Sequence, residues 1–89
     1  MTRRMLKYKI SSTESMQTDV LMPRAALIRA VGMQGDHQVY AWAEAAAGDH
    51  MFRTFRVIAT GGDVPDFGAY LGTVFDGPFV WHIYEMPPA

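Results

Sequence analysis

The chain has 89 residues, of which 49% are hydrophobic, and it carries a formal net charge of −1 and no cysteine. A chain of this length suits one domain with a small core, so we expect residues 1–89 to fold as a single unit. The absence of cysteine excludes a disulfide scaffold, no apolar run approaches the roughly 20 residues that span a bilayer, and the weak net charge gives no global attraction to nucleic acid.

Glycine and aspartate are neighbours at four regularly spaced places in the chain. The pairs lie thirteen or fourteen residues apart, at Gly35-Asp36, Gly48-Asp49, Gly62-Asp63 and Asp76-Gly77. Glycine adopts positive φ without a steric cost, and aspartate hydrogen-bonds to nearby backbone, so such pairs between apolar runs mark reversals of the chain. The spacing therefore predicts a succession of short β-strands.

Two alternating segments open the chain. Residues 5–10 alternate apolar side chains with Lys7 and Lys9, and residues 16–22 alternate again up to Pro23. Each pattern is typical of a half-buried strand, and proline ends the second because it cannot donate to a sheet. Since only a short polar segment separates the two strands, we expect them to form a hairpin.

The next two strands are predicted at residues 25–33 and 38–45. Alanine content alone would allow a short helix in the first, but the flanking proline and glycines leave too little length for one. In the second, small side chains alternate with Tyr40 and Trp42. The small face suits the close approach of another layer, whereas Tyr40 and Trp42 form either the main core or an aromatic patch.

Three further strands are expected at residues 51–60, 70–75 and 79–85. The turn at Gly35-Asp36 suits a hairpin between 25–33 and 38–45, and the turn at Asp76-Gly77 joins the last two strands as a pair. The longest loop, residues 61–68, holds three of the eight glycines, and we expect any mobile functional loop to be this one. Together the segments predict an all-β fold, a compact antiparallel sandwich or partly open barrel of about seven short strands.

No group of residues carries a committed chemistry. Two Gly-Asp-His triplets, ending at His37 and His50, bracket one strand whose extended residues would hold them roughly 30 Å apart. We therefore interpret them as turns and not as a metal site. Asp63 and Asp66 share a loop but lack the ligand spacing of a calcium loop, and the serines have no histidine nearby in the sequence. We expect no enzyme activity, no catalytic residue, no metal and no cofactor.

One segment, residues 52–56, interleaves aromatic and basic side chains as single-strand-binding sheets do. Strand alternation sends Arg53 and Arg56 to opposite faces, whereas counterion release needs several bases on one surface. We therefore expect the phenylalanines of this segment to lie in the core and nucleic acid not to be a partner.

Several segments, taken in order, resemble a family of small, functionally uncharacterised phage and prophage proteins. They are Leu6-Lys7-Tyr8, Leu21-Met22-Pro23, Val39-Tyr40-Ala41-Trp42-Ala43, Arg53-Thr54-Phe55, Ala59-Thr60-Gly61, Tyr70-Leu71-Gly72-Thr73 and Val80-Trp81-His82-Ile83-Tyr84-Glu85. The resemblance covers nearly the whole chain. It implies a phage accessory product that acts in the host cytoplasm, and the family has no established enzymatic activity to carry over.

We therefore expect a small non-catalytic phage protein that binds and blocks a host protein, a component of a defence system being one candidate. An oligomer that sequesters a nucleotide-like ligand between protomers is one alternative, and a minor virion or assembly component is another. A homo-oligomer is compatible with these functions, and no membrane is involved. The candidate partner- or ligand-binding residues are Tyr40, Trp42, Arg53, Asp63, Asp66, Phe67, Trp81, His82 and Tyr84.

Overall fold

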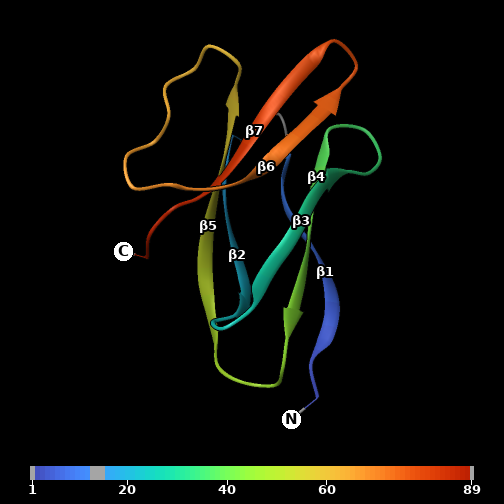
Figure 1. The fold of residues 1–89 in the computed structure, drawn as a ribbon, viewed down its shortest axis with the longest axis vertical. Coiled ribbons are helices and arrows are strands. Elements are labelled where there is room, and N and C mark those ends of the chain that lie inside the picture. The colour runs from blue at the N-terminus through green and yellow to red at the C-terminus, as the bar shows by residue number, and fades with distance from the viewer. Residues whose placement is uncertain (1, 13–15, 89) are drawn as a thin grey trace.

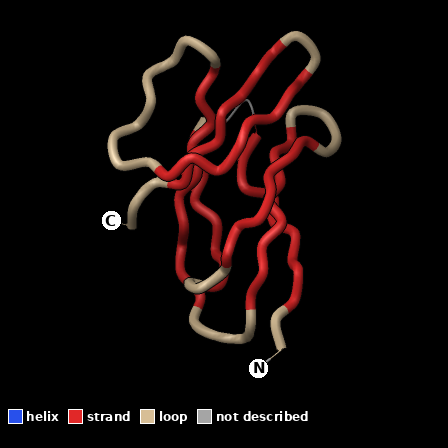
Figure 2. Tube along the Cα trace, in the orientation of Figure 1, coloured by secondary structure: helices blue, strands red, loops and turns tan. Residues whose placement is uncertain are grey.

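The computed structural model describes residues 2–12 and 16–88, and these residues form strands and loops without a helix (Figure 2). None of them therefore belongs to a helix that could cross a membrane. The seven strands are β1 (Arg4–Ser12), β2 (Gln17–Pro23), β3 (Leu27–Met33), β4 (Gln38–Ala45), β5 (His50–Ala59), β6 (Ala69–Asp76) and β7 (Phe79–Glu85) (Figure 1). The predicted all-β class is confirmed.

The strands form two antiparallel sheets that pack face to face. The three-stranded sheet has the order β1-β4-β3, and the four-stranded sheet has the order β2-β5-β7-β6. Two predicted hairpins are confirmed, because β3 pairs with β4 across the turn at Gly35 and β6 pairs with β7 across the turn at Gly77. The architecture is therefore a sandwich, which is one of the two architectures that the sequence predicted.

The predicted hairpin of the first two strands is wrong. β1 pairs with β4, from Arg4 opposite Ala45 to Ser12 opposite Gln38, and β2 pairs with β5 in the other sheet. The register of β1 shifts between Lys9 and Ser11, which is where a bulge lets a strand bend. Because the chain then passes from one sheet to the other, both strands can turn an apolar face toward the same core.

The small side chains of β4 form the centre of the core. Val39, Ala41 and Ala43 are fully buried in the three-stranded sheet, and they face the fully buried Phe55 and Ile83 of the other sheet. Alanine at the middle of the strand leaves room for the larger side chains opposite, as close-packed interiors require. The prediction that the small face meets another layer is confirmed.

The same alternation settles where the neighbouring aromatic residues lie. Tyr40 and Trp42 occupy the outer face of the three-stranded sheet, where both are partly exposed. They form an aromatic patch and not the main core. On β5, Phe55 is buried as expected, but Phe52 is 65% exposed, so the expectation that both phenylalanines lie in the core is wrong for Phe52.

Candidate functional site

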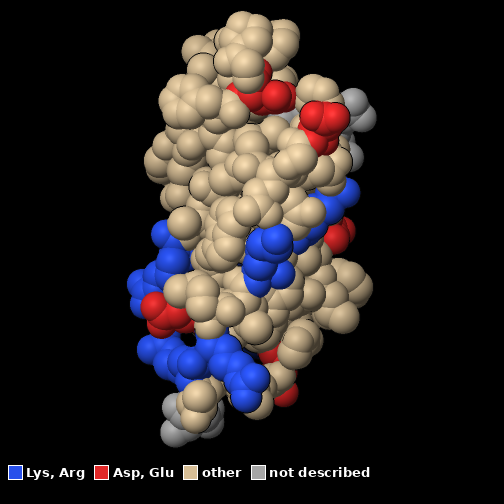
Figure 3. Space-filling view, turned by 90° about the vertical axis from the view of Figure 1, so that its right-hand side faces the viewer, with Lys and Arg blue, Asp and Glu red and all other residues tan. Residues whose placement is uncertain are grey.

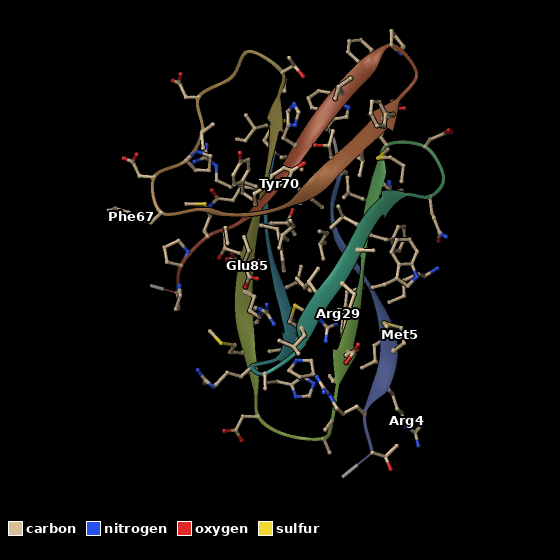
Figure 4. All side chains as sticks on the ribbon, in the orientation of Figure 1. Arg4, Met5, Arg29, Phe67, Tyr70 and Glu85 are labelled. Carbon is tan, nitrogen blue, oxygen red and sulfur yellow. The ribbon has the colours of Figure 1, made fainter. Side chains whose placement is uncertain are left out.

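The loop between β5 and β6 ends in a tight turn that presents an aromatic side chain to solvent. The backbone N–H of Gly68 donates to the carbonyl of Pro65 at 3.3 Å, so residues 65–68 form a hydrogen-bonded β-turn. Pro65 is buried, whereas Phe67 is 90% exposed. Figure 4 shows Phe67 at the outer bend of this loop, away from both sheets.

Phe67 stands in a backbone conformation that disfavours its residue type. It is the third residue of the turn and has a φ of 61°, the position and sign that type II turns ordinarily reserve for glycine or asparagine. A bulky side chain in the left-handed region costs roughly 1–2 kcal/mol. Phe67 is therefore an unfavourable residue type for this turn position, and its apolar ring buries almost no surface in return.

Packing holds this turn against the four-stranded sheet. A Cβ on Gly68 would lie 3.3 Å from Cδ1 of Tyr84 and 3.0 Å from Cγ of Pro65, so the turn approaches the sheet closely because this residue has no side chain. Tyr84 also meets Tyr70 edge to face, with ring centroids 5.5 Å apart. The turn that carries Phe67 is thus packed against the sheet through Pro65, Gly68 and Tyr84.

A hydrogen-bonded chain of side chains crosses the outer face of this sheet. Nε2 of His82 lies 2.9 Å from Oγ1 of Thr60, and Nδ1 lies 3.0 Å from Oγ1 of Thr73. The hydroxyl of Thr73 also bonds to that of Tyr70. Both ring nitrogens of His82 are therefore engaged, and the histidine links Thr60 at the end of β5 to Thr73 of β6 across the outer face of the sheet.

A shallow pocket of about 250 Å³ opens between that chain and the loop. Ile58, Val64 and Tyr84 supply its apolar lining, and Thr60, His82 and the backbone of Gly61 and Gly62 supply its polar lining. Of the candidate residues, this surface brings together His82 and Tyr84 beside the loop that carries Asp63, Asp66 and Phe67. The exposed Val64 and Tyr70 belong to it too, although the sequence analysis did not select them.

Arg53 is a structural residue that binds Glu85, the last residue of β7. Its Nε and Nη2 donate to the two carboxylate oxygens of Glu85 at 2.6 and 2.7 Å, and its Nη1 donates to the carbonyl of Ala26 at 2.8 Å. The Arg53 and Glu85 side chains are only 12% and 19% exposed. The guanidinium therefore ties β7 to the corner between β2 and β3.

Trp81 also turns inward. It pairs with Ala59 on the core side of the four-stranded sheet, and its ring stacks on Phe79 with centroids 6.0 Å apart. Its Nε1 is buried and has no hydrogen-bond partner among the described residues. The candidate residues therefore lie in three places. Asp63, Asp66, Phe67, His82 and Tyr84 belong to the loop surface, Tyr40 and Trp42 to the outer face of the three-stranded sheet, and Arg53 and Trp81 to the core side of the four-stranded sheet.

We predict that Trp81→Phe changes the free energy of unfolding by less than about 1 kcal/mol. The smaller ring loses apolar area, but the substitution also removes a buried donor that the fold leaves unsatisfied. Urea unfolding followed by circular dichroism measures the change. Trp81→Ala is the comparison, because it removes the stacking ring and is expected to cost about 3 kcal/mol or more. Equal losses in the two variants would contradict the prediction.

The histidine triplets lie at the two ends of β4, as expected for turns. His37 bonds through Nδ1 to Asp76 of the β6–β7 hairpin at 2.8 Å, and Nδ1 of His50 lies 3.2 Å from the carbonyl of Gly48. Within residues 2–12 and 16–88, no three acidic or histidine side chains gather as metal ligands. Of the three serines in the polar segment, Ser11 and Ser12 end β1, and Ser15 lies outside the described residues.

The whole sequence, residues 1–89, matches the model of a family described as a domain of unknown function, DUF7352. The chain belongs to this family. No curated protein and no solved structure matches it.

Proposed function

We propose that this DUF7352 chain is a non-catalytic phage product that binds a host protein in the host cytoplasm and blocks it. The observation that carries the proposal is Phe67, an aromatic ring that is 90% exposed at a φ of 61°. Strained, exposed residues of this kind concentrate at binding sites, because the fold itself gains nothing from them. Phe67 is the anchor that enters an apolar pocket on the partner.

The acidic residues around Phe67 indicate the charge of the partner surface that would bind it. Asp63 and Asp66 are exposed in the same loop, and residues 57–89 contain no lysine or arginine. The complementary partner surface is an apolar pocket rimmed by basic side chains, since matched potentials speed association and exclude wrong partners. Val64 and Tyr70, exposed by 64% and 58%, extend the apolar contact on either side of the anchor.

Phe67→Asn tests the proposal with two readouts of opposite sign. Asparagine tolerates the left-handed region, so the variant is expected to be more stable by about 1 kcal/mol. Removal of a central aromatic anchor costs 2 kcal/mol or more in binding, or about 30-fold in affinity. The variant should therefore melt at a higher temperature and lose the partner.

The partner is identified by recovering tagged protein from a bacterial host and analysing the retained proteins by mass spectrometry. Phe52→Asn is the matched control, because Phe52 is also exposed but lies in β5 at the other end of the sheet. The control should retain the partner that Phe67→Asn loses. Retention of the same protein by both variants would contradict the proposal, as would a bound small molecule in a homo-oligomer or recovery of the chain only in purified particles.

A further inference from the structure

The outer face of the three-stranded sheet gathers most of the basic residues that the sequence scatters over its first third. Lys7 and Lys9 of β1 lie directly opposite Trp42 and Tyr40 of β4. Arg3 and Arg29 reach the same face, where they bond to Glu44 at 3.2 and 2.9 Å. We call this surface, made of Arg3, Lys7, Lys9, Arg29 and Trp42, the basic face.

The charge of the basic face differs from that of the rest of the molecule. The basic face holds four cationic side chains and the carboxylate of Glu44, which bonds to two of them, although the chain as a whole has a net charge of −1. Figure 3, which looks onto the side of β1, shows Lys and Arg gathered over the lower and middle parts of this side, with acidic residues among them and at the upper end. The hydrogen bond from Arg29, together with the charges of Arg29 and Arg3, lowers the pKa of Glu44 against the opposing effect of desolvation. The basic face thus has an excess of positive charge.

Trp42 lies among the cationic residues of the basic face, and its indole ring is uncovered on the side of β3. Its neighbours on that side are Ala30 and Gly32, which are too small to cover an indole ring. A Cβ on Gly32 would lie 3.2 Å from Cζ3 of Trp42, so the ring rests on the glycine backbone and the absence of a side chain there makes room for it. The result is an indole supported from below and partly exposed above.

Tyr40 positions one of the lysines beside that indole. The ammonium of Lys7 lies 4.8 Å from the centroid of the Tyr40 ring, and it also donates to Oε1 of Gln34 at 2.9 Å. A stacking surface and an oriented cation are therefore held side by side on one face of the three-stranded sheet.

We propose that the basic face binds single-stranded nucleic acid, with a base stacked on Trp42 and phosphates beside Lys7 and Lys9. Single-strand-binding sheets combine aromatic platforms with cations that follow the backbone, and unpaired bases expose the ring faces that such a platform needs. Strand alternation sends Arg53 and Arg56 to opposite faces of the four-stranded sheet, which is why the sequence predicts no nucleic-acid partner. The cations of the basic face lie together on the three-stranded sheet, so that separation does not affect them. The proposal is independent of the Phe67 contact.

Fluorescence anisotropy with labelled oligo-dT and oligo-rU tests the proposal and distinguishes DNA from RNA. The logarithm of the association constant of the native chain should fall with the logarithm of salt concentration with a slope of about −2, and Lys7→Gln/Lys9→Gln should reduce this slope by about 1.4. Trp42→Leu should weaken binding about 5-fold or more and leave the slope unchanged. In the Trp81→Phe background, the emission of Trp42 should be quenched on binding, because Trp42 is then the one tryptophan of the chain.

Arg24→Gln/Arg56→Gln is the control, since it removes the same charge from outside the basic face and should leave the affinity and the slope unchanged. Melting temperatures of all variants check that each one folds. Absence of salt-dependent binding by the native chain would overturn the proposal, and so would equal losses in the control pair. Binding of poly-glutamate as tightly as the oligonucleotides would also overturn it, because it would assign the basic face to an acidic protein.

Discussion

Replacement of Glu85 by alanine is expected to cost about 3–5 kcal/mol of the free energy of unfolding. The substitution leaves the guanidinium of Arg53 without its carboxylate, in a place where that side chain is only 12% exposed. Small domains are stable by roughly 5–15 kcal/mol, so the variant should lie close to the limit of folding. Urea unfolding of the native chain and the variant, followed by circular dichroism, measures the difference.

Glu44→Ala is the matched control for this substitution. Glu44 also bonds to two arginines, Arg3 and Arg29, but those side chains are about half exposed, at 52% and 50%. Solvent screens such pairs, so the control should unfold almost as the native chain does. The double variant Arg53→Met/Glu85→Leu should recover part of the loss, because no charge stays buried, whereas the Ala26 carbonyl still lacks its donor. A Glu85→Ala variant as stable as Glu44→Ala would contradict this account of Arg53.

Gly72→Ala is expected to cost about 1–3 kcal/mol, because β6 and β3 cross closely at this residue. A Cβ on Gly72 would lie 2.6 Å from Cγ2 of Val31, and valine cannot withdraw its methyl group without leaving its preferred rotamer. The two strands belong to different sheets, so the contact helps to set how one edge of the sandwich closes. Thermal unfolding measures the effect.

A second substitution separates this steric effect from the general effect of replacing glycine. Val31→Ala/Gly72→Ala should cost less than the loss expected from adding the single substitutions, because the clashing methyl groups are gone. Gly48→Ala is the control, since no atom lies within 4 Å of a Cβ built there. If Gly72→Ala and Gly48→Ala lost equal stability, the close crossing would not be a constraint on the fold.

The strand bounds were predictable because their signals are local. Gly-Asp pairs mark turns and alternation marks faces, so the bounds predicted for 38–45 coincide with those of β4, and the hairpins on either side of Gly35 and Gly77 followed from the same patterns. The partner of β1 was not predictable in this way. Whether a chain pairs with its neighbour or crosses to another sheet depends on which distant apolar face completes the core.

The candidate site shows the same division between local and distant information. The loop at residues 61–68 was predictable from its glycines, but the left-handed conformation of Phe67 was not, since turn statistics favour glycine or asparagine there. The role of Arg53 depends on Glu85, which lies 32 residues away in the sequence. The basic face was missed because its cations come from different strands, and only the pairing of β1 with β4 brings Lys7 beside Trp42.

The central claim is that the Phe67 loop binds a host protein, separately from the basic face. The most direct test compares Phe67→Asn with Lys7→Gln/Lys9→Gln for retention of the host protein and for affinity toward the oligonucleotides. We predict that Phe67→Asn loses the protein and keeps its affinity for the oligonucleotides, and that the lysine variant keeps the protein. Retention of the host protein by Phe67→Asn at native levels would contradict the claim.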